Sequence, residues 1–280
     1  MMQASASSTG LLHARLEVEF AQLSDPGRVR QNNEDYFGYV QPGSPLQAQS
    51  HGWLFALADG VGGQQLGEVA SRTAVESILA NFSRSVGGES HTGLLRRLVQ
   101  AANHAVYEAG HSVGAGGVRM ATTIVVCTLR YDRAVVAHVG DSRCYLVRNG
   151  HATAITRDHT VSSEQARLGL VTAKEAVGSG NRNLLTRSLG NDLFVAVETG
   201  DYLLLPGDIL LLCSDGLHNS VEDAEIAHLL GPGVDLSTAC QNIVALANER
   251  DGTDNLTAQV IRVHNVERTG LYRGRRYKLH

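Results

Sequence analysis

The sequence contains little cysteine, and what it contains does not build a disulfide framework. Its 280 residues include four cysteines, no two of which form a Cys-x-x-Cys pair. Cys127, Cys144 and Cys213 stand inside apolar runs, where a cysteine usually packs as a small hydrophobe, and Cys240 lies in a helical pattern. Free cysteines in these settings indicate a reducing compartment, and we expect a cytoplasmic protein.

Long apolar runs and an excess of positive charge are absent as well. No stretch approaches the roughly 18 apolar residues that cross a bilayer, and residues 1–10 have neither the basic start nor the apolar segment of a signal peptide. The formal net charge is −4, whereas a nucleic-acid-binding protein is usually basic. We therefore expect neither a membrane nor a nucleic-acid partner. Lysine occurs only at Lys174 and Lys278, a bias toward arginine that a GC-rich genome explains better than phosphate binding does.

The residues that are present support a folded core. Hydrophobic residues make up 43% of the chain and charged residues 19%, which excludes a disordered chain. By their hydrophobic periodicity, the expected strands are 16–23, 36–40, 53–58, 121–129, 134–139, 144–148, 194–198, 208–214 and 256–263, and the expected helices are 64–84, 92–109, 221–230 and 236–250. Strands that come in runs and helices that come in pairs predict an α+β fold, with antiparallel sheets and helices on their outer faces.

Four segments differ from these patterns in composition. Residues 1–14 are small and polar and indicate a flexible leader, and residues 41–52 form a Pro/Gly/Ser loop. Residues 157–188 are polar and only briefly helical, which indicates an inserted, mobile subdomain. Residues 266–280 form an arginine-rich basic tail that we expect to be solvated. A single main domain over residues 15–265 remains.

Aspartates recur at the ends of the apolar strands. Asp59, Asp141 and Asp215 each end such a strand beside a glycine, Asp254 begins the last strand, and Asp35 precedes another. Strand ends that converge would crowd these carboxylates together, which is costly unless cations neutralise them, and hard oxygen ligands select magnesium or manganese. Asp-Gly is also a common turn pair, which explains any single site equally well but accounts poorly for all five. The histidines contain no HExxH motif and no Cys/His box, so we expect no competing metal site from them.

Other residues near these strands have ordinary structural explanations. His138 lies within an apolar strand, where a hydrogen-bonded structural histidine is the common case. His159 stands at the entrance of the polar subdomain, where capping of a helix is as good an explanation as a function. Arg143 is expected to pair with a carboxylate rather than bind phosphate, and Thr122 and Thr123 open a strand.

Seven motifs follow one another along nearly the whole chain, and together they resemble a known family. They are Arg28–Asp35, Ala58–Gly63, Gly67–Ala70, Ala121–Thr123, Val139–Arg143, Leu212–Leu217 and Asp254–Thr257. With these motifs the sequence resembles the metal-dependent protein phosphatases (PPM, the type 2C family) in their compact bacterial form. The resemblance implies a four-layer α-β-β-α sandwich of two antiparallel sheets flanked by helices, with a flap that corresponds to residues 157–188.

The resemblance also implies roles for particular residues. Asp59 would bridge two metal ions, and the carbonyl of Gly60 would complete one of the two sites. Asp215 and Asp254 would ligate the other ion. Arg30 matches the arginine that grips the phosphate of the substrate in this family.

Further matches concern the surroundings of the two ions. Glu34 and Asp35 would hold metal-bound waters. Asp141, together with an aspartate of the two-metal site, would hold the third ion found in bacterial members, and Asn183 would lie near it. Val61 stands where some relatives carry the histidine that protonates the leaving group, so the general acid is open here, and a metal-bound water could supply the proton.

The activity implied by the resemblance is hydrolysis of phosphoserine and phosphothreonine by a hydroxide that bridges metal ions, with two or three Mn²⁺ or Mg²⁺ ions as cofactor. The implied partners are phosphorylated proteins and a cognate bacterial Ser/Thr kinase, and the implied state is a monomer. Two alternatives stay open. One is a catalytically silent, phosphatase-like binding module, which loss of a metal aspartate would favour, although none is lost. The other is a phosphoester hydrolase for small molecules, which the metal site alone does not exclude.

Overall fold

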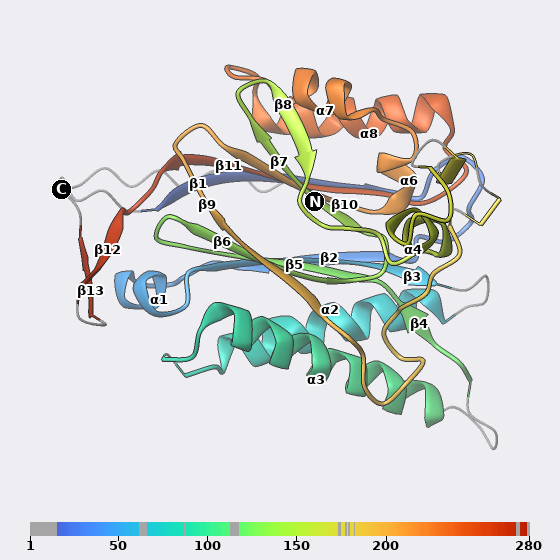
Figure 1. The fold of residues 1–280 in the computed structure, drawn as a ribbon, viewed down its shortest axis with the longest axis horizontal. Helices are drawn as coiled ribbons and strands as arrows, with labels where there is room; N and C mark the ends of the chain where they lie inside the picture. Colours follow the sequence, from blue (N-terminus) through green and yellow to red (C-terminus); the bar gives the residue numbers. More distant parts are fainter. Residues whose placement is uncertain are drawn as a thin grey trace.

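Two antiparallel sheets lie face to face in the computed structural model, and helices cover the outer side of each (Figure 1). The structure describes residues 16–61, 66–86, 88–112, 118–172, 175–176, 178, 180–181, 183–272 and 275–278. All the strand pairs of the two sheets in these ranges are antiparallel. The predicted four-layer α-β-β-α sandwich is thereby confirmed.

The first sheet has the strand order β1-β11-β10-β7-β8. Its strands are β1 (Glu17–Asp25), β7 (Arg143–Arg148), β8 (His151–Ala154), β10 (Ile209–Cys213) and β11 (Leu256–Asn265). On its outer side lie α6 (Asp215–His218), α7 (Asp223–Leu229) and α8 (Leu236–Arg250). Ile226 of α7 and Ile243 of α8 belong to one buried cluster with Leu211 and Val260 of the sheet, so these helices close one side of the core.

The second sheet has the strand order β2-β3-β5-β6-β9, and β4 pairs with the end of β3. Its strands are β2 (Asp35–Val40), β3 (Trp53–Val61), β4 (Ala121–Thr122), β5 (Ile124–Arg130), β6 (Arg133–Val139) and β9 (Glu198–Leu203). Helices α2 (Gly67–Ser83) and α3 (His91–His111) cover its outer side. In α3 the buried Leu95, Leu98, Ala102 and Val106 recur at spacings of three and four, the helical period that the sequence shows.

The apolar strand β3 explains why both faces of its sheet are covered. Leu54 and Ala56 pack toward α2 and α3, whereas Phe55 and Leu57 pack toward the other sheet. Alternate side chains of a strand point to opposite faces, so an unbroken apolar run needs a partner layer on each side. Phe20 of β1 meets Phe55 edge to face, with ring centroids 5.4 Å apart, and this contact joins the two sheets.

Two of the expected secondary-structure assignments are wrong. The loop at 41–52 contains the helix α1 (Pro45–Ser50), which begins because the Ser44 hydroxyl accepts from the Gln47 N–H. The strand expected at 194–198 begins only at Glu198. Val195 and Val197 still pack against the core, whereas Phe194 is 82% exposed. Side chains of α3 bind the Leu193 carbonyl just before this segment, in place of a neighbouring strand.

The strand expected at 121–129 is divided in two at Thr123. The Thr123 N–H donates to the Asp59 carbonyl, and this contact separates β4 from β5. Two short elements lie outside the sequence prediction. Strand β8 follows β7 through the turn at Asn149 and Gly150, whose φ angles of 51° and 75° suit a tight hairpin. The single-turn helix α6 follows β10 directly.

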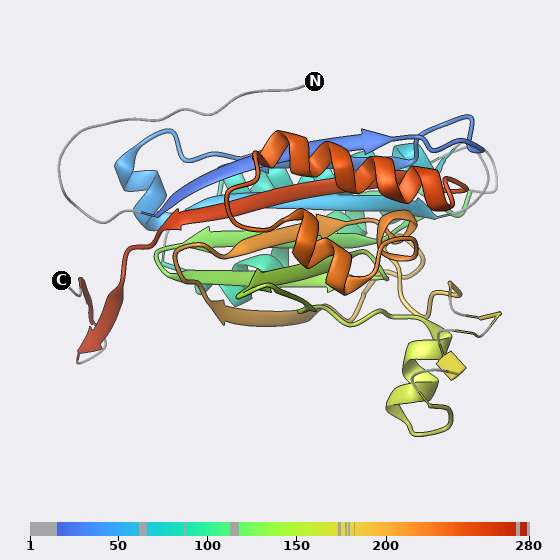
Figure 2. The same cartoon turned by 90° about the horizontal axis from the view of Figure 1, so that it is seen from above.

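The polar segment 157–188 projects from one end of the sandwich (Figure 2). It contains α4 (Val161–Arg167), and its two ends are joined by a bridge between Thr160 and Leu185. In the basic tail, where composition indicated a solvated end, strands β12 (Thr269–Tyr272) and β13 (Arg275–Lys278) pair with each other. The leader predicted at 1–14 lies outside the described residues, among which no helix is long and apolar enough to cross a bilayer.

Candidate metal centre

The five motif aspartates come from segments that meet at one end of the sandwich. Asp35 begins β2 and lies directly opposite Asp59 of β3 in the antiparallel ladder. Asp215 begins α6 just after β10, Asp254 precedes β11, which pairs with β10, and Asp141 follows the end of β6. The five carboxyls are close enough to interact, because the charges of the other four aspartates raise the pKa of Asp59. The strand ends therefore converge as the sequence predicts.

Burial and mutual repulsion raise the pKa of four of these carboxyls. Burial is the largest cause for each, and the charge of a neighbouring aspartate adds to it. The pKa of Asp141 is raised to about 8, that of Asp35 to about 7 and that of Asp215 to about 6, and the pKa of Asp59 lies well above its ordinary value. Carboxyls crowded in this way take up protons unless a cation holds them ionised.

Asp35 shows how the residues present fit a metal ion. Its Oδ2 accepts hydrogen bonds from the Ser214 hydroxyl at 2.8 Å and the Thr257 hydroxyl at 2.6 Å. Its Oδ1 is buried and has no hydrogen-bond partner among the described atoms. One oxygen is thus fixed by hydroxyls while the other is left for a cation or for a water bound to one, as a ligand of Mn²⁺ or Mg²⁺ requires. Neither Ser214 nor Thr257 is among the sequence-predicted site residues, although both lie within the motifs Leu212–Leu217 and Asp254–Thr257.

Thr122 and Thr123 fix the backbone of Asp59. The Thr123 N–H and the Thr122 hydroxyl both donate to the Asp59 carbonyl, at 2.8 and 2.7 Å, and the Asp59 N–H donates to the Thr123 hydroxyl at 3.0 Å. The next residue, Gly60, passes so close to Gly67 that a Cβ on Gly60 would lie 2.4 Å from its backbone. The threonines are structural, as expected, and the close approach explains why a glycine follows Asp59.

Arg30 and Glu34 lie at the rim of the cluster. The Arg30 Nη2 donates to Asp254 Oδ2 at 3.0 Å, and the charges of Glu34 and Asp59 also act on this guanidinium. The Arg30 side chain is 44% exposed, so it can leave Asp254 for an incoming anion. Glu34 is placed by its backbone, whose carbonyl accepts from the Gly60 N–H at 3.1 Å. The structure therefore brings both predicted residues to the aspartates.

Asp141 and Asn183 line one pocket of about 350 Å³ between the flap and α6, which brings together two residues that the sequence places near a third ion. Arg143 also lines it, and donates from Nε and Nη2 to both carboxylate oxygens of Asp158, at 2.8 and 2.7 Å. The expected pairing of Arg143 with a carboxylate is confirmed. His218 Nε2 lies 2.9 Å from the Asp141 carbonyl and holds this loop to α6.

The expectation that histidines assemble no metal-ligand group needs correction. The structure brings His138, His159 and Glu198 together, with one potential ligand atom of each within 4.8 Å of the others. Hydrogen bonds already occupy these atoms. His159 Nδ1 accepts from the Gly140 N–H at 3.1 Å, so its Nε2 carries the proton and faces Glu198 at 3.2 Å. His138 Nε2 contacts the Arg157 carbonyl at 2.9 Å, which confirms a structural histidine. The helix cap belongs to Thr160 and not to His159.

A two-sheet sandwich that gathers buried carboxylates at its strand ends is suited to metal-dependent hydrolysis. A family model described as Protein phosphatase 2C matches residues 28–259. The chain belongs to the protein phosphatase 2C family, and it is a serine/threonine protein phosphatase that uses Mn²⁺ or Mg²⁺.

Individual relatives cover almost the whole domain. The serine/threonine phosphatase stp of Listeria innocua is 32% identical over 256 residues, which are 90% of this chain and 96% of that protein. The solved serine/threonine phosphatase of S. agalactiae is 32% identical, with a TM-score of 0.80, and 88% of this chain and 100% of that one are covered. The catalytic domain of the phosphatase PstP, solved in complex with two manganese ions, is 32% identical with a TM-score of 0.75, over 89% of this chain and 100% of that one.

Proposed function

We propose that this phosphatase cleaves phosphoserine and phosphothreonine in proteins at the aspartate cluster, with two divalent ions there and a third beside Asp141. Asp59 would bridge the two ions, and the Gly60 carbonyl, Asp215 and Asp254 would be further ligands. When bound, the ions supply a water of lowered pKa and neutralise charge on the phosphoryl group. The other steps depend on residues of the chain itself.

The observation that carries this proposal is the crowding of buried carboxyls, of which Asp35, Asp59 and Asp141 form no ion pair among the described residues. The pKa of Asp141 is raised to about 8 and that of Asp35 to about 7, and the buried Asp35 Oδ1 has no hydrogen-bond partner among the described atoms. A fold that buries acids in this way loses stability unless a cation joins them. The cluster is therefore built around ions that the chain does not itself supply.

The residues around the cluster would position the substrate. Arg30 is the exposed cation at its rim, and its planar guanidinium suits two oxygens of a phosphate group. Glu34 and Asp35 would orient waters, and Asn183 would assist Asp141 at the third ion. Val61, which is 37% exposed, offers no proton to the leaving oxygen, so water in the site would protonate it.

The biological setting is part of the same proposal. A protein phosphatase acts on phosphorylated proteins, and we propose a cognate bacterial Ser/Thr kinase as the enzyme that it opposes. We further propose that the chain acts as a monomer in the cytoplasm. Its four cysteines are free and buried, which suits a reducing compartment.

The test is phosphate release from a phosphothreonine peptide with manganese, with magnesium and with chelator. Native protein is compared with Asp59→Asn and with the matched control Asp201→Asn. The Asp201 carboxylate lies outside the cluster and pairs with Arg133 at a distance of 2.8 Å. We expect phosphate release only with metal and little change in Asp201→Asn. Asp59→Asn should lose about 100-fold or more in rate, because a factor of ten corresponds to about 1.4 kcal/mol and a metal ion supplies several kcal/mol of transition-state stabilisation.

Other results would select the alternatives. Manganese binding in calorimetry without release by any folded preparation would indicate a phosphatase-like binding module. Faster turnover of nucleotides than of phosphopeptides would indicate a hydrolase of small molecules. Equal losses in Asp59→Asn and Asp201→Asn would contradict the assignment of the metal site to the aspartate cluster.

A further inference from the structure

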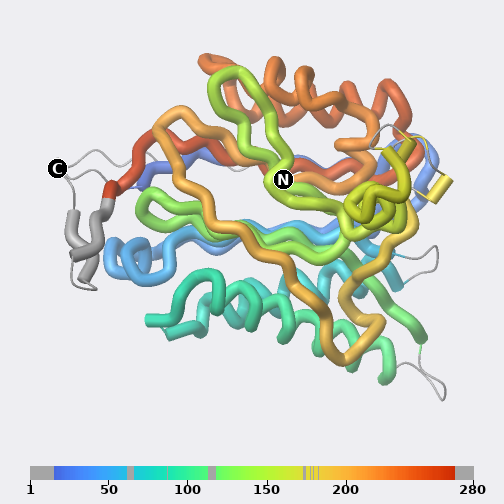
Figure 3. The backbone as a smooth tube through the Cα atoms, viewed as in Figure 1, coloured from blue at the N-terminus to red at the C-terminus, as the bar shows by residue number. Residues whose placement is uncertain are grey.

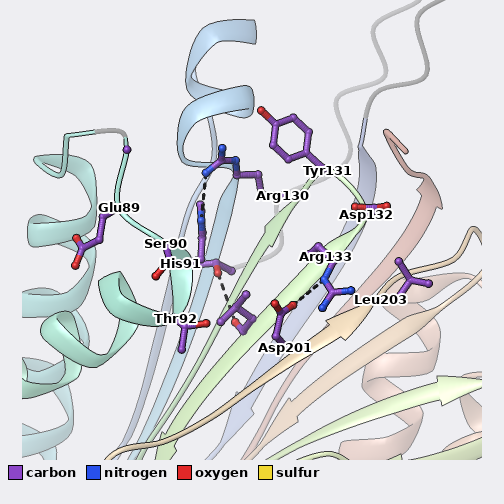
Figure 4. Close-up of a pocket in the computed structure, with 13 residues that line it drawn as sticks. Glu89, Ser90, His91, Thr92, Arg130, Tyr131, Asp132, Arg133, Asp201 and Leu203 are labelled. Atoms are coloured by element: carbon purple, nitrogen blue, oxygen red, sulfur yellow. Dashed lines mark hydrogen bonds and ion pairs between the residues drawn. The ribbon is translucent and has the colours of Figure 1, made fainter. Parts of the chain in front are cut away.

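Figure 4 shows a second pocket, of about 700 Å³. It lies at the opposite end of β5 from Thr123 and the aspartates. The start of α3, the β5–β6 turn and β9 line it. Strand β5 connects the two ends: Thr123, which holds Asp59, precedes the strand, and Arg130 is its last residue. Seven residues of strand span roughly 20 Å, so this pocket is separate from the metal centre.

Two acidic side chains of the pocket are already neutralised. Asp201 accepts from Arg133 Nε at 2.8 Å, and Glu89 accepts from Arg97 Nη2 at 2.9 Å. Asp132 lies on the turn at the rim, and its charge helps to raise the pKa of Arg133. These three carboxylates therefore lie around the pocket, and none of them forms an ion pair with Arg130.

Arg130 has one buried guanidinium donor, Nε, that the described residues leave without an acceptor. Its Nη1 lies 3.3 Å from His91 Nδ1, and its buried Nε has no hydrogen-bond partner. His91 Nε2 contacts the His51 carbonyl at 2.8 Å and so carries the proton, which leaves Nδ1 as a neutral acceptor. The residues outside the described ranges contain no Asp or Glu, so no side chain of this chain adds a carboxylate for Arg130.

Tyr131 holds Arg130 in place at the expense of backbone strain. Its φ of 59° lies in the left-handed region, which a bulky residue seldom adopts and which glycine or asparagine usually occupies in such a turn. The Tyr131 hydroxyl donates to the Gln49 carbonyl at 2.9 Å, and the ring lies 4.8 Å from the Arg130 guanidinium carbon. Strain of this kind persists where the surrounding contacts hold the residue in place, and the strained Tyr131 lies with its ring against the Arg130 guanidinium.

We propose that this pocket binds a small molecule through an oxyanion, a phosphate or carboxylate group, that the Arg130 guanidinium receives. The volume suits a ligand of cofactor size. The first turn of α3, which opens on the pocket, contains no acidic residue to offset the positive end of the helix dipole. A buried guanidinium donor without an acceptor is costly, and an oxyanion would satisfy it.

The test follows the backbone amides of the ¹⁵N-labelled full chain with magnesium present, while inorganic phosphate or acetate is added. The position of each shift separates the two sites: the amides of Tyr131 and Asp132 report on this pocket, and those of Asp59 and Gly60 report on the metal centre. The variants are Arg130→Gln, Arg130→Lys and the control Arg96→Gln, whose guanidinium donates to Thr199 outside the pocket.

We expect a saturable shift at Tyr131 and Asp132 with at least one of the two anions. Phosphate alone would assign the site to phosphorylated ligands, and acetate as well would extend it to carboxylates. Arg130→Gln should weaken binding about tenfold or more, as expected for a charge-assisted hydrogen bond, Arg130→Lys should weaken it less, and Arg96→Gln should leave it unchanged. Absence of a saturable shift with either anion, or equal affinity in native protein and in both Arg130 variants, would overturn the proposal.

Discussion

The carboxylates at the two ends of the β5–β6 hairpin differ in whether an arginine pairs with them. At the turn end, Asp201 pairs with Arg133. At the open end, Asp59 and Asp141 have no arginine partner among the described residues, and the pKa values of both are raised. The hairpin runs the length of its sheet, so one structural unit joins both ends (Figure 3).

The difference shows which charges the chain balances by itself and which it leaves to a ligand. Asp158 and Asp141, which line the same pocket, show this difference at close range. Burial would raise the pKa of Asp158, but the two hydrogen bonds from Arg143 lower it, whereas Asp141 has no such hydrogen bonds and burial keeps its pKa raised despite the charge of Arg143. Asp158 has a guanidinium partner and serves the scaffold, whereas the buried Asp141 has none and suits a cation.

The largest expected effect on stability comes from removing the arginine partner of Asp158, which Asp141 already lacks. Arg143→Met would leave the mostly buried Asp158 carboxylate without its cation. We expect a loss of about 3 kcal/mol in the free energy of unfolding. This value is at the lower end of the range for breaking a buried ion pair, because both side chains keep some exposure. Urea denaturation of the chelated protein measures it. The double variant Arg143→Met/Asp158→Asn should recover part of the loss. A loss no larger than that of an exposed pair would remove the distinction between the two ends.

The raised pKa values predict a pH dependence of the metal-free protein. Asp141 and Asp35 bind protons more tightly when folded, so their stabilisation is complete below the unfolded pKa near 3.8 and is lost as pH rises through about 7 and 8. Between pH 6.5 and 8.5 the free energy of unfolding should fall by on the order of 2 kcal/mol. Histidines with lowered pKa act mainly below pH 6.5.

Urea denaturation in chelator at several pH values measures this dependence, with manganese as the control. Manganese should stabilise the protein more as pH rises, because it binds the ionised carboxyls. Stability that stays constant or rises over this window in chelator would show that the carboxyls at the open end are not crowded as the structure indicates.

Gly140 tests how tightly the open end is built. Its φ is +106°, and a Cβ there would lie 2.7 Å from the side chain of Thr123, which fixes Asp59. Gly140→Ala should cost about 1–3 kcal/mol through strain and collision, and it should also lower activity. The matched control is Gly150→Ala at the β7–β8 turn, where φ is +75° and no atom lies within 4 Å. Equal costs at the two positions would exclude a role for the Thr123 contact.

The smallest effect is expected at the turn end. The Arg133–Asp201 pair is well exposed, with 38% and 47% of the two side chains accessible. Arg133→Met should therefore change the free energy of unfolding by less than about 1 kcal/mol, and salt should reduce the change further. A salt titration of the urea midpoint checks this. A cost like that of Arg143→Met would show that exposure does not separate the two pairs.

Much of the fold is readable from local periodicity. Helix 236–250 is predicted with the bounds that α8 has, because its apolar residues recur at the helical period from a clear start to a clear end. The strand expected at 194–198 fails for a distant reason. Gln100 and Asn103 of α3 bind the Leu193 carbonyl, and no local pattern predicts these contacts.

The sequence by itself determined the fold class and singled out the aspartates that we propose as metal ligands, because strand periodicity and strand-end motifs are local properties. Only the tertiary structure decided what surrounds them. Asp35 is fixed by hydroxyls 179 and 222 residues away, at Ser214 and Thr257. At the turn end, Asp201 pairs with Arg133, whereas Arg130 Nη1 faces His91 Nδ1. Burial and charge pairing depend on which distant segments come together, so only the folded chain fixes the pKa of a carboxyl and the partner of an arginine.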